Sequence, residues 1–381
     1  MNPDLDVRER LERAAAQLRV GEPPIDRILR QARRRRLRMG ATASSVLLAL
    51  VGLAWGLAVI SGLGRRTTVP ETRPHILAAI PVDRSPAMVA VGEGAVWVAT
   101  FEGKPRPVLL RIDPLTNRIV ATTRIGFRGA GLGDLAVGAG AVWVSAAGTV
   151  NRIDPRTDRV VARIHLPSPS TLAVGFGSLW VGDFNGDSIV RVDPATNRPV
   201  ARIPIQASPW SLVTGEGYLW VLDNQGSVEK IDPATSRVIA VFGHHLVVDS
   251  EGSSFDLAVS DSGVWITYSN ALDADTDRLI RIDSRTGAVT KAIDLRGATV
   301  VAVGPDGVWA TTGLLVTVTA KAIHRYSEGV VRIDPTTGQI VQRIAVRSPA
   351  DIAVGDGNLW VLSSLRRGML YKIGPLSPAR T

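Results

Sequence analysis

The feature that most constrains the fold of this chain is a tryptophan-centred pentapeptide that recurs along it. GAVWV occupies residues 94–98 and returns unchanged at 140–144. Looser copies follow, namely GSLWV (177–181), GYLWV (217–221), SGVWI (262–266), DGVWA (306–310) and GNLWV (358–362). Seven of the nine tryptophans occupy this slot: Trp97, Trp143, Trp180, Trp220, Trp265, Trp309 and Trp360. Their successive spacings of 46, 37, 40, 45, 44 and 51 residues indicate one structural unit repeated along the chain.

Two further landmarks accompany each tryptophan. A small apolar run precedes it, as in MVAVG (88–92) and LAVG (172–175). An Asp-Pro-x-Thr segment follows it, as in RIDPLTNRIVATTRI (111–125) and RIDPRTDRVVARIHL (152–166). Each unit therefore holds four short runs of β-branched and apolar residues separated by turn residues, which predicts four antiparallel strands.

The four predicted strands have different surroundings. The first is almost wholly small and apolar, which is typical of a strand buried on both faces. Between the third and fourth strands, proline presets φ for a turn and the aspartate caps backbone amides. The fourth strand carries arginine and threonine between its apolar residues, which indicates an outer edge that faces water.

Four strands repeated about every 40–45 residues is the pattern of a β-propeller blade. One large indole per blade would fill the wedge between adjacent sheets. The last unit ends at MLYKIGP (369–375) without a fourth strand, and HILAAIPV (75–82) precedes the first unit. We therefore predict an all-β, seven-bladed propeller over residues 75–376, closed by an N-terminal strand at 75–82 in the last blade.

Charge and cysteine content exclude several classes of function. The net charge of +9 resides mainly near the N-terminus, since residues 1–40 carry +5 and residues 67–381 only +2. The nearly neutral C-terminal region has no nucleic-acid footprint, so we expect no nucleic-acid partner. The chain has no cysteine, which excludes disulfides, zinc–thiolate sites and a cysteine nucleophile.

An uncharged segment near the N-terminus predicts a membrane anchor. Residues 41–63 are long and apolar enough for a single transmembrane helix across the bilayer. More positive charge lies before the segment, in RQARRRRLR (30–38), than after it, which places the N-terminus in the cytoplasm. The alternative is a cleaved secretory signal, although the 38-residue leader is long and no small-x-small site precedes the Arg65–Arg66 pair.

The regions that flank the anchor are short. The sequence predicts a basic amphipathic helical stub over residues 1–40 and an extended linker over residues 64–74. The stub is either an interfacial helix whose arginines meet anionic lipid or a docking site for a cytoplasmic partner. We expect the chain in the plasma membrane of a bacterium, as a single-pass protein with the propeller outside the cytoplasm.

The repeat resembles a known group of proteins. The pattern AVWV…RIDPxTxxVVAxI is similar to the repeat of bacterial YVTN-type and virginiamycin B lyase-like propellers, over about residues 75–375. That resemblance implies the propeller fold. In virginiamycin B lyase, histidine and glutamate on one face act with a divalent metal, but no residue of this chain can be matched to that motif, so the resemblance assigns no catalytic role here.

Candidate ligand-binding residues lie in the loops that differ between repeats. The VGxG and DPxT turns share one face of the predicted propeller, and their repetition indicates a structural role. The opposite loops vary, and binding residues concentrate in such loops. Trp210 is the one tryptophan of residues 75–376 outside the repeated slot, so it either stacks on a ligand or packs under a neighbouring loop. The candidates are Asp183, Asn185, Trp210, Asn224, Tyr268, Tyr326 and Arg366.

A second set of polar residues has the chemistry for acid–base work or metal binding. It comprises His244, His245, Glu251, His324 and Glu328. None of their spacings is a metal signature, and the sequence favours reading them as ordinary polar residues of the surface. DADTD (273–277) resembles a calcium loop without its glycine and distal glutamate. A basic group in the same loops could favour an anionic ligand: Lys321, Arg325, Arg366 and Arg367.

The sequence therefore favours a membrane-anchored extracytoplasmic propeller that acts as a sensor or scaffold. We expect it to bind a ligand or protein through its variable loops, with the lipid bilayer as a second partner and no cofactor. The alternatives are an extracytoplasmic lyase or hydrolase, resembling virginiamycin B lyase, and a purely structural scaffold. No nucleophile elbow, phosphate loop or dinucleotide fingerprint occurs in the sequence.

Overall fold

A computed structural model describes residues 74–82, 85–100, 107–125, 132–146, 148–243, 253–270, 277–312, 318–319, 322–323, 329–364 and 368–376. These residues belong to one compact unit, Arg73–Thr381. The predicted stub, membrane helix and most of the linker fall outside this part of the chain. Within it, no helix combines the length and the hydropathy that a membrane crossing requires.

The described residues form seven antiparallel sheets of four strands and one two-stranded hairpin. The first four sheets contain β2 (Pro86–Gly92), β3 (Ala95–Thr100), β4 (Val108–Asp113) and β5 (Arg118–Arg124); β6 (Leu132–Gly138), β7 (Ala141–Ala146), β8 (Thr149–Asp154) and β9 (Arg159–His165); β10 (Pro169–Gly175), β11 (Ser178–Asp183), β12 (Ser188–Asp193) and β13 (Arg198–Pro204); and β14 (Pro209–Gly215), β15 (Tyr218–Asp223), β16 (Val228–Asp232) and β17 (Arg237–Phe242).

The remaining sheets contain β18 (Ser253–Ser260), β19 (Gly263–Asn270), β20 (Arg278–Ile282) and β21 (Val289–Asp294); β22 (Ala298–Gly304), β23 (Gly307–Thr312), β26 (Gly329–Ile333) and β27 (Ile340–Ala345); and β28 (Pro349–Gly355), β29 (Asn358–Ser363), β30 (Met369–Gly374) and β1 (His75–Pro81). The hairpin β24 (Val318–Thr319) and β25 (Ala322–Ile323) is inserted in the sixth sheet. The 3-10 turn η1 (Phe184–Gly186) joins β11 to β12.

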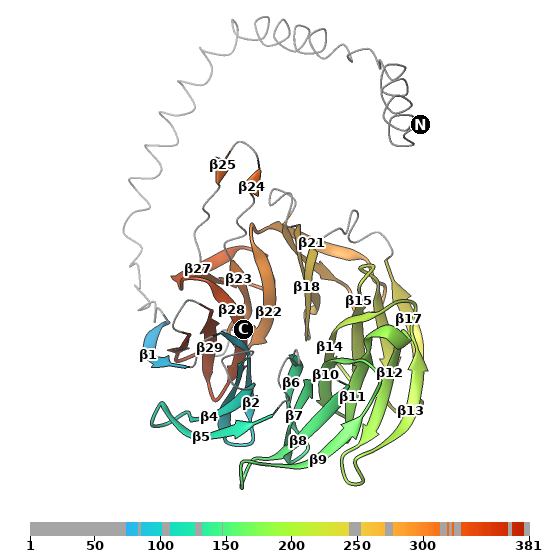
Figure 1. The fold of residues 1–381 in the computed structure, drawn as a ribbon. Helices are drawn as coiled ribbons and strands as arrows, with labels where there is room; N and C mark the ends of the chain where they lie inside the picture. The colour runs from blue at the N-terminus through green and yellow to red at the C-terminus, as the bar shows by residue number, and fades with distance from the viewer. Residues whose placement is uncertain are drawn as a thin grey trace, which may run out of the picture. The chain divides into compact units, whose positions relative to one another are not determined.

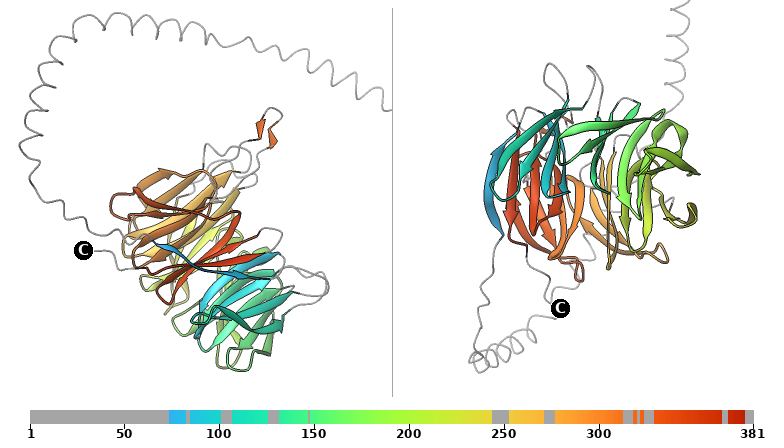
Figure 2. Two further views of the ribbon diagram at one scale, coloured as in Figure 1. Left: turned by 90° about the vertical axis from the view of Figure 1, so that its left-hand side faces the viewer. Right: turned by 90° about the horizontal axis from the view of Figure 1, so that it is seen from below.

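The seven sheets are arranged as a closed ring. The first strand of each sheet contacts the first strands of the sheets on both sides, and β28 of the last sheet contacts β2 of the first. Figure 1 shows the chain passing round this ring, so that the red strands of the last sheet return beside blue β1 and β2. The side view in Figure 2 shows the sheets stacked face to face around the ring. The architecture is a seven-bladed β-propeller, which confirms the predicted blade number.

Segments from the two ends of the described chain share the seventh sheet. Strand β1 is antiparallel to β30, with His75 opposite Gly374 and Pro81 opposite Met369. The backbone N–H of Val82 extends the pairing by donating to the carbonyl of Gly368 at 2.9 Å. Ile80 and Val82 are both buried beside Trp360. The outer strand of this sheet thus comes from the beginning of the propeller sequence.

The repeated tryptophans fill the spaces between sheets, as the sequence predicts. All seven have no measurable exposure. Each belongs to a buried cluster that includes residues of the second strand of the following sheet: Trp97 is clustered with Val142 and Val144, and Trp360 with Val96 across the junction of the last and first sheets. Removing an indole from such a site costs about 3–5 kcal/mol in unfolding free energy. The tryptophans therefore hold each sheet to its successor all round the ring.

The prediction that the first strand of each blade is buried on both faces is wrong. The strand that carries tryptophan is the fully buried one, with all six residues buried in β3 (Ala95–Thr100). In β2 (Pro86–Gly92), by contrast, only Pro86 and Val89 are buried and the others are partly exposed. First strands form the inner ring and are paired along one edge only, so their other edge borders the centre of the propeller. Their small side chains instead permit close approach between neighbouring first strands: a Cβ on Gly92 would lie 2.7 Å from Val137 Cγ1.

A cation lies opposite every tryptophan on the third strand of its sheet. Trp143 pairs in register with Arg152, whose Cζ lies 5.3 Å from the indole centroid. The same side chain reaches the following sheet, where Nη1 donates to the carbonyl of Pro194 at 2.7 Å. Arg191, Lys230, Arg281 and Lys372 repeat this pair of contacts. We refer to this arrangement as the Trp–cation contact.

The sixth sheet departs from this pattern for a topological reason. Arg332 stands opposite Trp309, yet its Nη1 contacts Asp306 Oδ2 of its own sheet at 3.2 Å. The following sheet takes its fourth strand from β1, so the chain makes no turn there between a third and a fourth strand. Consequently no turn carbonyl exists for Arg332 to reach. Asp306 replaces that carbonyl and also accepts the Trp309 indole N–H at 3.0 Å through Oδ1.

Candidate binding face

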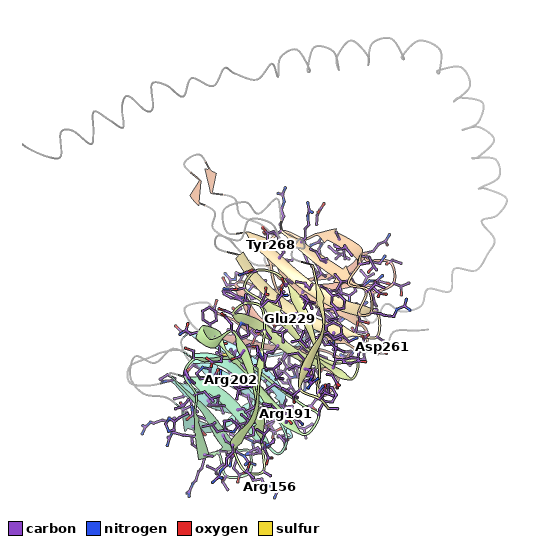
Figure 3. All side chains as sticks on the ribbon, turned by 90° about the vertical axis from the view of Figure 1, so that its right-hand side faces the viewer. Arg156, Arg191, Arg202, Glu229, Asp261 and Tyr268 are labelled. Atoms are coloured by element: carbon purple, nitrogen blue, oxygen red, sulfur yellow. The ribbon has the colours of Figure 1, made fainter. Side chains whose placement is uncertain are left out.

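The loops of the propeller lie on two opposite faces. We call the face that holds the first-to-second and third-to-fourth strand connections the turn face, and the opposite one the variable-loop face. In Figure 3, Tyr268 and Asp261 mark the two ends of the fifth sheet, Tyr268 at the variable-loop face and Asp261 at the turn face. Arg202 lies toward the variable-loop face and Arg156 toward the turn face.

The turn face is built from one repeated local structure. In the first blade, Asp113 Oδ1 accepts the backbone N–H of Leu115 at 2.8 Å and that of Thr116 at 3.4 Å. These hydrogen bonds stabilise the ionised carboxylate and lower the pKa of Asp113. The equivalent aspartates of five other blades have lowered pKa values for the same reason: Asp154, Asp193, Asp232, Asp283 and Asp334. This regularity indicates a structural role for the turn face.

Three carboxylates join neighbouring first strands in the inner ring. Asp134 Oδ2 accepts the backbone N–H of Leu172 at 2.7 Å, which links the second and third sheets. Asp256 Oδ2 accepts from Val301 at 2.9 Å, and Asp351 Oδ2 accepts from Val89 at 2.7 Å. The third of these links crosses from the last sheet to the first. Each carboxylate therefore bridges two blades at the centre of the ring.

The surroundings of these carboxylates disfavour their charge. Burial raises the pKa of Asp351 to about 8 and that of Asp134 to about 6, and it also raises the pKa of Asp256. The backbone N–H donors oppose this effect, whereas Asp256 and Asp134 add to it at Asp351 by like-charge repulsion. The side chains retain some surface exposure, but protein surrounds them on most sides. Of the three, Asp351 is therefore the carboxyl that favours its protonated form at neutral pH.

On the variable-loop face, the junction of the third and fourth blades carries exposed aromatic surface. Trp210 belongs to β14, and 43% of its surface is exposed. Its indole lies 6.5 Å, centroid to centroid and tilted by 55°, from the ring of Phe184 in the third blade. Phe184 is itself half-buried and held by its backbone N–H, which donates to Ser168 O at 2.9 Å. The two rings meet across the boundary between the blades.

Polar side chains surround this aromatic pair. The exposed Asn185 donates through Nδ2 to Ser168 Oγ at 2.6 Å. The exposed Asp187 accepts through Oδ1 from Ser208 Oγ at 3.1 Å. We call the group Phe184, Asn185, Asp187, Ser208 and Trp210 the Trp210 shelf. Phe184, Asn185 and Asp187 lie in the connection from β11 to β12, whereas Ser208 and Trp210 lie at the start of β14 and just before it. The backbone N–H of Ile205 donates to Asp187 O at 3.0 Å and joins these two segments.

Next to the shelf, the buried Asp183 forms an ion pair with the half-exposed Arg202. Asp183 is 2% exposed, and its Oδ2 accepts from Arg202 Nη1 at 2.6 Å. The same Nη1 donates to Ser188 Oγ at 2.7 Å. A Cβ on Gly186 would lie 2.6 Å from Asp183 Oδ2, so the η1 turn passes directly over this carboxylate. Asp183 thus supports the turn that presents Phe184, rather than presenting its own carboxylate at the surface.

The other predicted ligand-binding residues have different positions. Asn224 follows β15 and is partly buried, with its backbone N–H donating to Ser208 O at 2.9 Å. Tyr268 is 6% exposed and packs in the core cluster that contains Trp220. The structure therefore brings Asn185 and Trp210 to the surface of one junction, with Asp183 and Asn224 supporting it. Tyr268 lies in the core of the fifth blade.

Several predicted residues lie outside the described part of the chain. They are Tyr326, Arg366, His244, His245, Glu251, His324 and Glu328. The basic residues Lys321, Arg325 and Arg367 and the DADT portion of the calcium-like segment lie outside it as well. Among the residues that are described, no group of three or more His, Asp or Glu side chains has the geometry to hold a metal ion.

Sequence reasoning missed several residues of this site. The sequence does not single out Phe184 and Asp187, which lie in a variable loop, or Arg202, which lies on a predicted outer strand. One signal for the shelf was present in the sequence. The motif Ser-Pro-x begins the first strand of four blades, where x is Ala87, Ser170, Trp210 or Ala350. The fourth-blade copy is the only one of these four with a large side chain.

Comparison with known proteins adds information about the fold. No family model matches the sequence, and no curated protein matches it. Solved structures do match. The chain has the fold of WD40 propellers. The Neurospora crassa Pan2 WD40 domain matches with a TM-score of 0.60 at 12% identity, over 79% of this chain and 95% of that one.

Two further solved structures match this fold with similar TM-scores. The WD40 propeller domain of Doa1 matches with a TM-score of 0.59 at 14% identity, over 80% of this chain and 97% of that one. A chain of the mitotic checkpoint complex matches with a TM-score of 0.62 at 11% identity, over 81% of this chain and 97% of that one. At such low identity these likenesses establish the architecture alone. The chain is a seven-bladed β-propeller with WD40-like structural neighbours.

Proposed function

We propose that this protein is a membrane-anchored binding module that holds a protein partner on the variable-loop face of an extracytoplasmic propeller. One observation carries the binding role: a tryptophan 43% exposed at a position that is small in the three other Ser-Pro-x blades. Trp210 is the second residue of β14, just after Pro209, where the pairing of the first and second strands is irregular. The pairing is also irregular just after Pro86, Pro169 and Pro349 in their blades. The fold therefore does not need a large side chain at position 210. Exposed aromatic side chains are enriched at surfaces where proteins bind partners.

The structural neighbours support a protein as the partner. One matched chain belongs to the mitotic checkpoint complex, an assembly of proteins. Propellers present rigid loops on a ring that barely deforms, which suits them to hold a partner without catalysis. The membrane part of the proposal rests on residues 41–63, and the orientation rests on the basic residues 30–38 before them.

Photo-crosslinking tests the binding face. A benzoylphenylalanine replaces Asn185 on the variable-loop face or, as the matched control, the exposed Phe176 on the turn face. We expect crosslinks in cells at position 185 to one protein that is identified by mass spectrometry, and binding of that purified protein to the full-length chain. Equal crosslinking at both positions, or none at position 185, would contradict the proposal.

Cysteine labelling tests the membrane topology. The natural chain has no cysteine, so a single introduced thiol is the only reactive one. Leu115→Cys places it at a residue that is 88% exposed in the propeller, and Ala15→Cys places it in the predicted cytoplasmic stub. An impermeant maleimide should label the propeller thiol in intact cells and the stub thiol only after lysis. Labelling of both or neither in intact cells would remove the anchored, outward-facing topology.

A further inference from the structure

The charges around the Trp210 shelf are unevenly compensated. Asp183 is paired with Arg202 at 2.6 Å. Asp187 is exposed, and its side-chain contact in the described structure is the neutral hydroxyl of Ser208. Within the described residues no cation lies at ion-pair distance from Asp187. The shelf therefore presents an uncompensated carboxylate next to aromatic faces.

The carboxylate and the aromatic rings lie within reach of one ligand group. Asp187 contacts Ser208, which stands two residues before Trp210, and two residues of extended chain span about 7 Å. Phe184 stands three residues before Asp187 in the same short connection and meets the Trp210 ring at 6.5 Å. A flat cation lying over the indole can thus also contact the carboxylate. Aromatic faces attract cations electrostatically, and a neighbouring carboxylate adds to that attraction.

The propeller itself uses the same chemistry at its turn face. Arg191 Cζ lies 5.1 Å from the Trp180 centroid, and the guanidinium also donates to oxygens of the next blade, Pro233 O at 2.9 Å and Ser236 Oγ at 3.1 Å. Those indoles are buried and their cation comes from the chain. At the shelf, the Trp210 indole is 43% exposed, and the Arg202 guanidinium is held by Asp183.

We propose that the Trp210 shelf binds a cationic side chain, arginine or lysine, of the protein partner. The cation lies over the Trp210 indole and pairs with Asp187, while Asn185 hydrogen-bonds to the partner backbone beside it. This inference rests on the proposed function, because it names the chemistry by which the variable-loop face recognises its partner. The partner accordingly presents a basic segment to the junction of the third and fourth blades.

The test uses the full-length chain labelled with 5-fluorotryptophan, with the Trp210 resonance assigned by its loss in Trp210→Ala. The probes are the blocked pentapeptide Gly-Gly-Arg-Gly-Gly and the same peptide with citrulline, the neutral isostere of arginine. We expect the arginine peptide to shift the Trp210 resonance saturably and the citrulline peptide to bind about tenfold more weakly. Asp187→Asn should weaken the arginine peptide about fivefold or more. Asp261→Asn, an exposed aspartate on the turn face, should change nothing (Figure 3).

Four results would overturn the proposal. Equal binding of the two peptides would show that charge is not recognised, and no saturable shift with either would show that the shelf binds no cation. A shift of the Trp210 resonance by chitotriose, with none by the arginine peptide, would assign the shelf to a saccharide. The Trp210→Ala melting temperature should stay within about 2 °C of the parent, because Ala87 and Ala350 occupy the equivalent sites. A large drop would make Trp210 a structural residue and likewise overturn the proposal.

These results are distinguishable from failure of the proposed function. If the peptides fail but position 185 still crosslinks one partner, the binding face stands and only the recognised chemistry is wrong. If crosslinking fails while the arginine peptide binds, the shelf is a cation site but the partner is not a protein held on this face in cells.

Discussion

Lys372 and Pro114 join the last strand of the propeller to its first blade. The ammonium Nζ donates to the carbonyl of Pro114 at 2.7 Å and lies 5.4 Å from the centroid of Trp360. The same contact recurs between successive blades, but here its partners are 258 residues apart in sequence. The Asp351–Val89 hydrogen bond also crosses the last junction of the ring, and β1 pairs with β30 in the last sheet before the chain enters the first.

Replacing Lys372 by methionine keeps the apolar stem and removes the charge. We expect the unfolding free energy to fall by about 1–3 kcal/mol, because a charged hydrogen bond and a cation–π contact are both lost. Lys291→Met is the matched control: that lysine also donates to a carbonyl, Thr337 O at 3.2 Å, but at an exposed site. Urea unfolding should show a change within about 0.5 kcal/mol for the control. Equal effects of the two substitutions would mean that the Trp–cation contact does not stabilise the closed ring.

The strand β1 supplies buried side chains to the same junction. Ile80 is 5% exposed and packs beside Trp360 and Val96, so Ile80→Ala should lower the unfolding free energy by about 2–4 kcal/mol. Leu77 lies on the same strand but is 44% exposed, and Leu77→Ala should cost less than about 1 kcal/mol. Denaturant unfolding of both variants measures the difference. A similar small loss for the two would show that β1 is not needed to hold the seventh blade.

The approach of neighbouring first strands should be sensitive to a single methyl group. A Cβ on Gly92 would lie 2.7 Å from Val137 Cγ1, so Gly92→Ala should destabilise the protein by about 1–3 kcal/mol through overpacking. Adding Val137→Ala makes room for the new methyl. We therefore expect the double variant to be more stable than the sum of the two single losses implies, by about 0.5 kcal/mol or more. Strict additivity in thermal or urea unfolding would refute the steric explanation.

The inner-ring carboxylates make stability depend on pH. The pKa of Asp351 is raised from 3.8 in the unfolded chain to about 8 in the folded one, so the folded state binds more protons between these values. The contribution of the protonated group is complete below 3.8 and is lost as the pH rises through about 8. Stability should thus decline from pH 6 to pH 8, by at most about 1.4 kcal/mol per pH unit for each proton.

An Asp351→Asn variant provides the check. An asparagine oxygen can still accept the Val89 N–H but carries no titratable proton, so most of the decline between pH 6 and pH 8 should disappear. Urea unfolding across this range, compared with the parent chain, measures the slope. The turn aspartate Asp113 serves as the control, because its lowered pKa confines its effect to acid pH, and Asp113→Asn should leave the slope unchanged. An unchanged slope in Asp351→Asn would show that another group titrates.

Much of the fold could be predicted from the sequence because each repeat independently predicts the same local structure. The slot of Trp97 and its six equivalents indicates the blade number, and the Asp-Pro-x-Thr turns separate the third strands from the fourth. The sequence does not predict the partial exposure of the first strand, because a small apolar segment has the same pattern whether it lies inside a sheet or at its inner edge. The pairing of each tryptophan with an arginine or lysine is likewise not predicted, although the two positions recur in every repeat.

Only some residues of the candidate site could be predicted from the sequence. Trp210 stood out because it broke the repeat, and Asn185 because its loop varied. The roles of Phe184 and Asp187 depend on contacts with the neighbouring blade. Phe184 contacts the Trp210 ring, and Asp187 accepts a hydrogen bond from Ser208. Asp183 and Tyr268 looked like surface groups by position, whereas packing buries both of them.

The sequence by itself determined the periodic features of this protein: the blade, its turns, its indole wedge and the number of blades. These are local or repeated properties, so each copy of the pattern confirms the others. Only the tertiary structure decided which residues meet across blade boundaries, such as Lys372 with Pro114, Asp351 with Val89 and Phe184 with Trp210. Contacts of that kind depend on how one sheet is rotated and stacked against the next. The spacing of residues along the chain does not determine that geometry.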